Sequence, residues 1–276
     1  MPELPEVETT RRGLKPHLEH QQVKQLKVRN PNLRWPVDAG LPRRLKDAKL
    51  VSLERRGKYL LLNFTKKNQP LGTALWHLGM SGSLRIVSQS EPVKKHDHID
   101  LVMADGIIAR FNDPRRFGAL VWTEEAVEQH ALISHLGPEP LFDEFTTDYL
   151  YQKSRKRQRD IKQFIMDSKI VVGVGNIYAN ESLFLAGIRP TVAAGKVSRA
   201  RMEKFHGHIV AVLAKAIKQG GTTLKDFVGG DGKPGYFQQQ LHVYGRGGLP
   251  CTVCQKPLKE IQLGKRTTVY CTACQK

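Results

Sequence analysis

The sequence predicts an α+β protein in which a β-sandwich or barrel precedes a helical region and a short cysteine-bounded hairpin. Short segments of alternating polar and apolar residues fill the first half of the chain, separated by turn residues. Helical spacing of apolar residues replaces this pattern after Thr123, and all four cysteines lie within the last 26 residues. Many short strands between turns are typical of sandwiches and barrels, and helices that follow a run of strands indicate an α+β fold or separate domains.

The composition indicates a polyanion as the partner. The chain has 276 residues, enough for two domains with separate cores. Lys and Arg total 44 against 26 Asp and Glu, which gives a formal net charge of +18. Nucleic acid is the commonest partner of such a positive field, although RNA-associated and membrane-surface proteins share this basicity. Because no apolar run reaches the length of a membrane span and no signal peptide opens the chain, we expect a cytosolic protein without a membrane partner.

One helix and eight strands are expected in the first half of the chain. Apolar residues from Leu4 to Leu18 follow helical spacing, and Pro5 suits the first turn of that helix. The strands alternate with period two and are bounded by Gly, Pro, Asn and Asp. They are 23–28, 50–53, 59–64, 74–78, 84–87, 99–103, 107–111 and 119–122. Asp105-Gly106 is a hairpin signal between the sixth and seventh strands.

Helices are expected in the second half. Their ranges are 124–136, 147–167, 176–186 and 198–219. Gly137-Pro138 ends the first, Gly187 ends the third, and Gly220-Gly221 ends the fourth. The change from strands to helices places a domain boundary near residues 125–135.

The first residues of the chain carry a candidate nucleophile. Removal of Met1 would leave Pro2 as a free secondary amine beside the carboxylate of Glu3. Free α-amino groups have a pKa of about 7.7–8.0, so a useful fraction is unprotonated at neutral pH. A secondary amine that attacks a sugar carbon gives an iminium that cannot shed its charge, which favours elimination, and Glu3 could donate or accept the proton. The alternative is that Pro5 and the neighbouring glutamates only begin a helix, and the two interpretations are compatible.

The cysteines predict one structural zinc ion. Cys251-x2-Cys254 is followed after 16 residues by Cys271-x2-Cys274, close to the standard spacing of a four-thiolate site. Four thiolates leave no open coordination position, so we expect no catalytic metal at this site. Paired disulfides and a redox CxxC motif are the alternatives; a cytosolic location argues against the first and the duplication of the motif against the second.

Two segments suit contact with a phosphate backbone. Gly173-Val174-Gly175-Asn176 precedes an expected helix, where exposed N–H groups and Asn176 can approach an anion. An ordinary N-cap Asn is the alternative. The segment from Lys153 to Lys162 holds six basic residues in ten, among them Arg157. Such a run is usually a solvated helix face, but its position before the glycine-rich loop is consistent with a phosphate track.

Three other residues have more than one interpretation. Lys58 follows Arg55-Arg56-Gly57 between two expected strands and would lie at a hairpin tip, where most lysines serve solubility. His96 and His98 could form a metal pair, but no matching third ligand is evident in the sequence. A phosphate contact is at least as plausible for this pair.

Together these residues resemble the bacterial formamidopyrimidine-DNA glycosylases, which excise oxidised purines such as 8-oxoguanine. The resemblance covers essentially the whole chain. Its motifs are PELPEVE at the start, RRGKYLL at 55–61, HLGMSGSLRI at 77–86, NDPRRFGA at 112–119, GVGNIYANESLF at 173–184, QGGTTLKDF at 219–227, DGKPGYF at 231–237 and the four-cysteine segment. It implies an N-terminal β-sandwich catalytic domain with flanking helices over 1–130, a helix–two-turn–helix DNA-binding domain over 131–228, and a lesion-recognition loop and zinc-finger hairpin over 229–276.

The resemblance also implies roles for individual residues. Pro2 corresponds to the nucleophile that forms a Schiff base with the sugar, and Glu3 to the acid that protonates the ring oxygen. Lys58 corresponds to the proton donor of β-elimination, and Arg266 to the residue linked to δ-elimination. The implied DNA contacts are His96, Arg115, Arg157, Lys162 and Asn176, with Met80, Arg115 and Phe117 as side chains that fill the space left by an everted nucleotide. A core role is the alternative for Met80 and Phe117.

The implied protein is a monomer that acts on duplex DNA containing an oxidised base, in the cytoplasm and at the nucleoid. It needs one structural Zn²⁺ and no catalytic metal or organic cofactor. Two alternatives stay open. The pyrimidine-specific relative, endonuclease VIII, shares Pro2, Glu3 and zinc but usually differs in the inserting residues, whereas a non-catalytic zinc-ribbon binder would leave the PELPE and RRGK matches unexplained.

Overall fold

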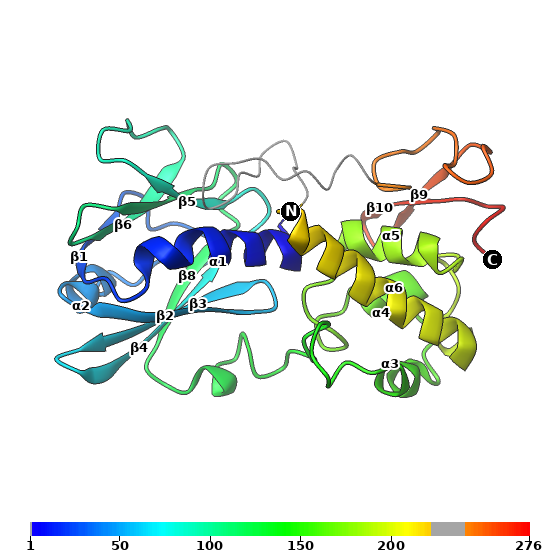
Figure 1. The fold of residues 1–276 in the computed structure, drawn as a ribbon, viewed down its shortest axis with the longest axis horizontal. Helices are drawn as coiled ribbons and strands as arrows, with labels where there is room; N and C mark the ends of the chain where they lie inside the picture. Colours follow the sequence, from blue (N-terminus) through cyan, green and yellow to red (C-terminus); the bar gives the residue numbers. More distant parts are fainter. Residues whose placement is uncertain (1, 222–240) are drawn as a thin grey trace. The chain divides into compact units, whose positions relative to one another are not determined.

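The computed structural model describes residues 2–221 and 241–276 (Figure 1). They form two compact units: the first contains residues 2–134 and 219–221, and the second contains residues 135–218 and 241–276. Among these residues no helix has both the length and the apolar composition needed to cross a membrane.

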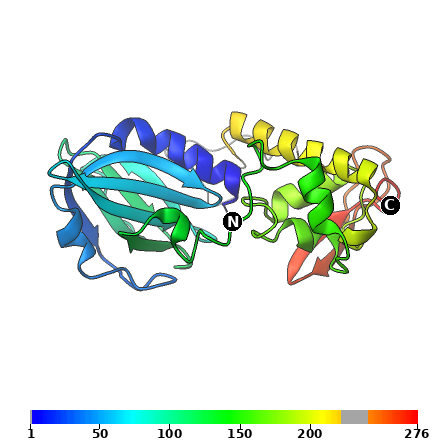
Figure 2. The same cartoon turned by 90° about the horizontal axis from the view of Figure 1, so that it is seen from below.

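The first unit is a sandwich of two antiparallel four-stranded sheets (Figure 2). One sheet has the order β1 (Val23–Val28), β6 (Asp97–Met103), β7 (Ile108–Asn112), β5 (Ser83–Val87). The other has the order β2 (Lys49–Arg56), β3 (Tyr59–Lys66), β4 (Gln69–His77), β8 (Ala119–Thr123). A single apolar core includes residues of both sheets, such as Leu60, Trp76, Leu101 and Phe111. All eight expected strands are present, and the sandwich is confirmed.

Two helices accompany the sandwich. α1 (Leu4–Leu18) buries Leu4, Val7, Leu14 and Leu18, the positions that the helical spacing predicts. It contacts β2, β3 and β5, so its apolar face covers the sandwich. α2 (Leu41–Leu45) was not predicted, because five residues are too short to show a periodic pattern.

A buried carboxylate joins α1 to the β2–β3 hairpin. Glu8 on α1 accepts hydrogen bonds from Arg11 and Arg12 at 2.8 Å, and its other oxygen lies 3.1 Å from Arg55 Nε on β2. Arg55 Nη1 in turn donates to the carbonyl of Gly57, in the β2–β3 turn, at 3.0 Å. Burial opposes ionisation of Glu8, but the hydrogen bonds from Arg11 and Arg12 and the charge of Arg55 outweigh it and lower its pKa from 4.5 to about 2.

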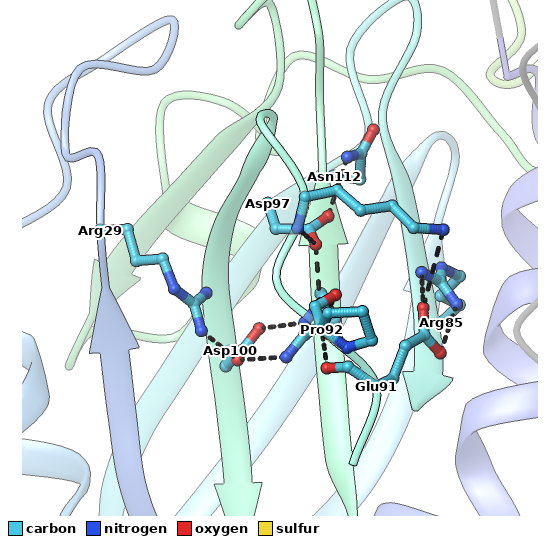
Figure 3. A network of polar contacts seen from close by, with 9 residues as sticks. Arg29, Arg85, Glu91, Pro92, Asp97, Asp100 and Asn112 are labelled. Carbon is cyan, nitrogen blue, oxygen red and sulfur yellow. Dashed lines mark hydrogen bonds and ion pairs between the residues drawn. The ribbon is translucent and has the colours of Figure 1, made fainter. Parts of the chain in front are cut away.

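A second charged network fixes the segment that joins β5 to β6 (Figure 3). Arg110 on β7 is 2% exposed and donates to both oxygens of Asp100 on β6, at 2.9 and 3.0 Å. Asp100 also accepts from Arg29 at 2.5 Å. Arg110 Nη1 reaches the carbonyls of Glu91 and Pro92 at 3.1 and 3.2 Å, which ties the connecting segment to the sheet. Since removal of one partner from a buried pair is strongly destabilising, this segment is held firmly.

The second unit is built mainly from helices. They are α3 (Thr147–Ser154), α4 (Ile161–Ile165), α5 (Asn176–Leu185) and α6 (Arg199–Lys218), with a short 3-10 turn η2 (Ala194–Lys196). Strands β9 (Lys259–Leu263) and β10 (Arg266–Tyr270) form an antiparallel hairpin between the two cysteine pairs. Val243, Leu258 and Val269 pack with the cysteines and Phe184 of α5 in one small core. The helices expected at 176–186 and 198–219 and the hairpin are therefore confirmed.

The single helix expected over 147–167 is two helices. Lys156 adopts a left-handed conformation with φ of 60°, which ends α3, and the Asp160 carboxylate accepts from Gln163 N at 2.9 Å and begins α4. Between them the Arg155 guanidinium donates to the carbonyls of Gly195 and Val197 at 2.8 Å. Side-chain bonds to distant backbone decide this break, and apolar periodicity does not report them.

The prediction of a helix over 124–136 is wrong. This segment contains only a 3-10 turn, η1 (Val127–Gln129), and Ile133 is its one buried residue. A helix of this length needs an apolar face packed against a core, because isolated short helices are marginal in water. With one buried side chain the segment gains too little from packing.

We expect the Glu8 cluster to make stability depend on pH in the acid range. A carboxylate whose folded pKa is lowered stabilises the fold above its unfolded pKa and loses that contribution as the pH falls through the folded value, so the loss should run from 4.5 to about 2. The shift corresponds to about 3 kcal/mol. Urea unfolding of the wild type and of Glu8→Gln should therefore differ most near neutral pH and converge as the pH falls. Glu128→Gln, at an exposed position, is the control, and an equal pH profile for wild type and Glu8→Gln would contradict the assignment.

Candidate active site

The start of α1 fixes the two residues expected to perform the chemistry. Pro2 is buried, and Glu3, the N-cap of α1, is 1% exposed. Glu3 and Glu6 form a capping box in which Glu3 N donates to Glu6 Oε2 at 2.8 Å. Pro5 lies in the first turn, so the helix-start interpretation is confirmed. In the same capping box the Glu3 carboxylate accepts from the backbone N–H of Glu6, so the cap holds Glu3, the residue after Pro2, in one place.

Lys58 lies at the turn between β2 and β3 and is half-buried. Gly57 precedes it with φ of 57°, a left-handed conformation that glycine adopts without strain. The link from Glu8 through Arg55 to the Gly57 carbonyl connects this turn to α1. Lys58 is thus carried by a turn that is tied to the helix that begins at Glu3.

His77 is a candidate site residue that the sequence analysis missed. Burial, together with the smaller effect of the charges of Lys58 and Arg34, lowers its pKa from 6.5 to about 4. Its Nδ1 accepts from Gly79 N at 2.9 Å, so the neutral ring carries its proton on Nε2 and can donate there. His77 pairs with Tyr59 across β3 and β4, and the ring centroids are 4.8 Å apart. This cross-strand register, which brings His77 beside the Lys58 turn, was the missing signal.

The three expected inserting side chains occupy two loops of the first unit. Met80 is half-buried in the loop after β4, while Arg115 and Phe117 lie in the turn after β7. Phe117 is 45% exposed, and Arg115 Cζ lies 4.8 Å from the centroid of its ring. A core role for Phe117 is therefore wrong. A large apolar ring left in water beside a guanidinium suits contact with a base.

His96 and His98 have different environments. His98 is 5% exposed and its Nε2 lies 2.8 Å from the Asp113 carbonyl, so it serves the fold. His96 is half-buried, directly before β6, and its carbonyl accepts from Asp113 N at 3.0 Å. Among the described residues, three or more potential metal ligands come together only at the four cysteines, so a metal site at the two histidines finds no support.

In the second unit, Asn176 is the first residue of α5, and Gly175 is the N-cap. The alternative of an N-cap Asn is therefore wrong. Asn176 Nδ2 donates to the Thr267 carbonyl at 3.0 Å, directly after Arg266 at the start of β10. Asn180, one turn along, accepts from Val269 N at 3.2 Å. The side-chain amides of these two asparagines thus hold the start of α5 against β10, so Asn176 and Arg266 lie close to each other.

The structure assigns Lys162 a role different from the expected DNA contact. It is 1% exposed, and its ammonium donates to the Thr267 carbonyl at 3.1 Å and to Thr268 Oγ1 at 2.6 Å. A buried ammonium of this kind needs such partners to offset its desolvation. Lys162 therefore anchors β10, the strand that begins at Arg266. The run of basic residues gave no sign of this role, because the charge of a residue does not indicate whether its side chain is buried. Arg157, in contrast, is exposed.

A cavity of about 380 Å³ lies beside Arg266. Arg159, Gln163 and Asp167 line it from the α4 side, and Gly264 and Arg266 line it from the hairpin. Gly264 has φ of 56° at the hairpin tip, a left-handed conformation that glycine adopts without strain. The half-buried Arg266 thus occupies a polar, positively charged recess.

Glu181 is a buried carboxylate that the sequence analysis did not single out. It is 2% exposed and accepts from the backbone N–H groups of His242, Val243 and Tyr244 at 2.8–2.9 Å. Three such bonds satisfy a buried carboxylate and fix this segment against α5. The DGKPGYF motif at 231–237, expected to cover the everted base, lies outside the described residues.

The four cysteines form a candidate metal centre. Their sulfur atoms all lie within 4.8 Å of one another. The distances of 3.4 Å between Cys254 and Cys271 and 4.0 Å between Cys251 and Cys274 are far longer than the roughly 2.0 Å of a disulfide. Backbone N–H groups of Val253 and Cys274 point to Cys251 Sγ and Cys271 Sγ at 3.4 Å. Four clustered thiols with N–H···S contacts fit a structural metal ion.

Comparison with known proteins agrees with this arrangement. The sequence profile of the formamidopyrimidine-DNA glycosylase N-terminal domain matches residues 1–120, and that of the formamidopyrimidine-DNA glycosylase H2TH domain matches residues 136–228. The formamidopyrimidine-DNA glycosylases of Saccharophagus degradans and Teredinibacter turnerae are 59% and 61% identical to the chain, and each alignment covers 100% of both proteins.

Solved structures give the same result. The MutM (Fpg) protein from Thermus thermophilus is 34% identical with a TM-score of 0.88, over 99% of this chain and 98% of the other. A Lactococcus lactis Fpg in complex with DNA that contains an abasic site is 31% identical with a TM-score of 0.90, over 99% of both chains. On the matched domains and the full-length identity, the chain belongs to the formamidopyrimidine-DNA glycosylase family.

Proposed function

We propose that this protein is a bifunctional DNA glycosylase and abasic-site lyase that removes oxidised purines from duplex DNA. Membership of the family over the full chain supports this function, and Lactococcus lactis relatives have been solved with DNA containing an abasic site or Fapy-dG. The observation that carries the proposal is the Pro2-Glu3 pair at the capped start of α1. An amine and a carboxylate at one fixed position supply a nucleophile and a proton donor.

Base excision would begin at the Pro2 nitrogen, once Met1 is removed. The amine attacks C1′ of the deoxyribose, the bond to the base breaks, and the base leaves with the electron pair. Glu3 donates a proton to the sugar ring oxygen as the ring opens, and the proton that the amine loses goes to the base anion, so the base leaves neutral. The product is an iminium between Pro2 and C1′, and base release requires no metal or organic cofactor.

Strand cleavage follows from the iminium, which acts as an electron sink. Loss of the C2′ proton expels the phosphate on the 3′ side, and a second elimination expels the phosphate on the 5′ side. We assign proton transfer in the first step to Lys58 and in the second to Arg266. The ties that fix these residues, from Arg55 to the Gly57 carbonyl and from Lys162 to the strand after Arg266, would hold them for this chemistry.

We assign the DNA contacts to both units. His96, Arg157 and Asn176 would bind phosphates, while Met80, Arg115 and Phe117 would enter the duplex at the everted nucleotide. We divide the chain into a catalytic domain over 1–130, a DNA-binding domain over 131–228 and a lesion-recognition and zinc segment over 229–276. A net charge of +18 suits binding to the phosphates of DNA, and we propose that the protein acts as a monomer on cytoplasmic DNA.

Borohydride trapping should test the nucleophile. With DNA that contains 8-oxoguanine opposite cytosine, protein that lacks Met1 should form a covalent adduct, because reduction converts the Pro2 iminium to a stable amine. The matched control is the same chain with one non-removable residue ahead of Pro2, which keeps its nitrogen in an amide and should give no adduct. Absence of an adduct with the processed protein would exclude the enzyme and leave a zinc-ribbon binder.

Glu3→Gln should separate binding from excision. Glutamine keeps the shape of the side chain but cannot donate the proton, so single-turnover base release should fall by about 100- to 10,000-fold. The affinity for lesion DNA, measured by fluorescence anisotropy, should stay close to that of the wild type. Wild-type excision by this variant would place the proton donor elsewhere.

We propose that the ion held by the four cysteines is zinc, because tetrahedral thiolate sites of this spacing favour it. Metal analysis should find one zinc ion per chain, and removal by a strong chelator should unfold the β9–β10 hairpin and abolish DNA binding, since Arg266 begins β10. Cys271→Ser should reproduce both effects. Unchanged DNA affinity after the chelator has removed the metal would contradict the assignment.

A further inference from the structure

The loop with Met80 and the turn with Arg115 and Phe117 are paired crossovers between the two sheets. Residues 78–82 pass from β4 in one sheet to β5 in the other, and residues 113–118 pass from β7 to β8 in the reverse sense. Because β4 pairs with β8 and β5 with β7, His77 lies opposite Ala119 at one end and Ser83 opposite Asn112 at the other. The two crossovers therefore start and end side by side.

One buried carboxylate joins these crossovers. Asp113 is 0% exposed, and its Oδ1 accepts from Ser81 Oγ in the neighbouring crossover at 2.7 Å. Within its own turn, Oδ2 accepts from Gly118 N at 2.7 Å, and Oδ1 also accepts from Arg115 N at 3.3 Å. A charged acceptor in a buried place makes strong hydrogen bonds, so the carboxylate holds both ends of its turn and the adjacent loop.

The backbones of the two crossovers are in direct contact. Gly79 has φ of 71°, and a Cβ there would lie 2.4 Å from Gly118 N and 2.5 Å from the carbonyl carbon of Phe117. Only glycine allows such an approach without displacement of the backbone. Met80 thus directly follows the point where the two crossovers touch, and the backbone of Phe117 is part of that contact.

The base of this assembly rests on β6. His98 Nε2 lies 2.8 Å from the Asp113 carbonyl, and the Arg116 N–H donates to the same oxygen at 3.2 Å. Asp113 N donates to the carbonyl of His96 at 3.0 Å. Asp113 is therefore bonded through its side chain and both of its backbone polar groups, while the tips at Arg115 and Phe117 stay exposed.

We propose that Asp113 and Ser81 are positioning residues that join the two crossovers into one rigid wedge, so that Met80, Arg115 and Phe117 enter the duplex as a unit. The proposal rests on the proposed function and adds residues that touch neither the base nor the sugar. Eversion of a paired nucleotide costs a few kcal/mol, and side chains that are already in place replace the lost stacking without a further ordering cost. Asp113 has several hydrogen bonds among the described residues. Of these, the bond from Ser81 is the one that joins its side chain to the other crossover.

Ser81→Ala is the variant that tests the wedge, because Asp113 retains its bonds to Gly118 and Arg115 and the fold loses only one hydroxyl. On a duplex with 8-oxoguanine, single-turnover excision should fall about tenfold, the effect of one hydrogen bond to a charged group. On single-stranded DNA with an abasic site, which needs no eversion, borohydride trapping should stay within about twofold of the wild type. Ser81→Thr keeps the hydroxyl and should restore duplex excision.

Ser52→Ala is the matched control, since Ser52 on β2 also donates a side-chain hydrogen bond, to Glu54 at 3.0 Å, and should leave both substrates unaffected. Equal duplex excision by Ser81→Ala and wild type would overturn the wedge, and so would an equal loss on both substrates, which would indicate damage to the fold or the chemistry. If the wild-type protein formed no adduct with either DNA, the proposed function itself would be contradicted. Failure of the wedge proposal and failure of the proposed function are therefore distinguishable.

Discussion

The pairing of β4 with β8 and of β5 with β7 is the constraint on which the first unit depends. One crossover runs from β4 to β5 and the other from β7 to β8, so each pair holds one end of each crossover. The register of the two pairs therefore sets where the crossovers lie. Antiparallel register is specified by burial of one face, because a shift of one residue would turn every apolar side chain outward. The half-buried Met80 and the exposed Arg115 and Phe117 are therefore positioned by the apolar core beneath them.

Buried charges perform a common task in both units. Glu8, Asp113, Lys162 and Glu181 are each almost fully buried and each bonds to groups far away in the sequence or to several backbone N–H or carbonyl groups. A buried charge with these partners is costly to leave unpaired, so it specifies one arrangement of the loops that it joins. Two residues with assigned chemistry lie next to such buried charges. Lys58 follows the turn residue Gly57, which Glu8 holds through Arg55, and Arg266 precedes Thr267, which Lys162 binds.

The motifs mix chemical and structural residues, and the sequence alone separates them poorly. PELPEVE contains Glu3, with its assigned role in proton transfer, and Glu8, which binds Arg55 of RRGKYLL. NDPRRFGA contains the exposed Phe117 and the buried Asp113 that holds its turn. In each case the two kinds of residue lie within five positions of each other, since a reactive or inserting side chain needs a rigid support close by.

Local sequence patterns were enough to predict the strands, the helices α1, α5 and α6, the cysteine hairpin and the family. Alternation with period two, helical spacing and CxxC pairs are local patterns, and burial of one face makes them reliable. Tertiary contacts, in contrast, determine that residues 124–136 are not helical, that α3 ends at Ser154, that Lys162 is buried and that His77 lies beside the Lys58 turn. These features depend on partners distant in the chain, such as Gly195 for Arg155 and Thr267 for Lys162, and a local pattern carries no information about a partner that folding brings from elsewhere.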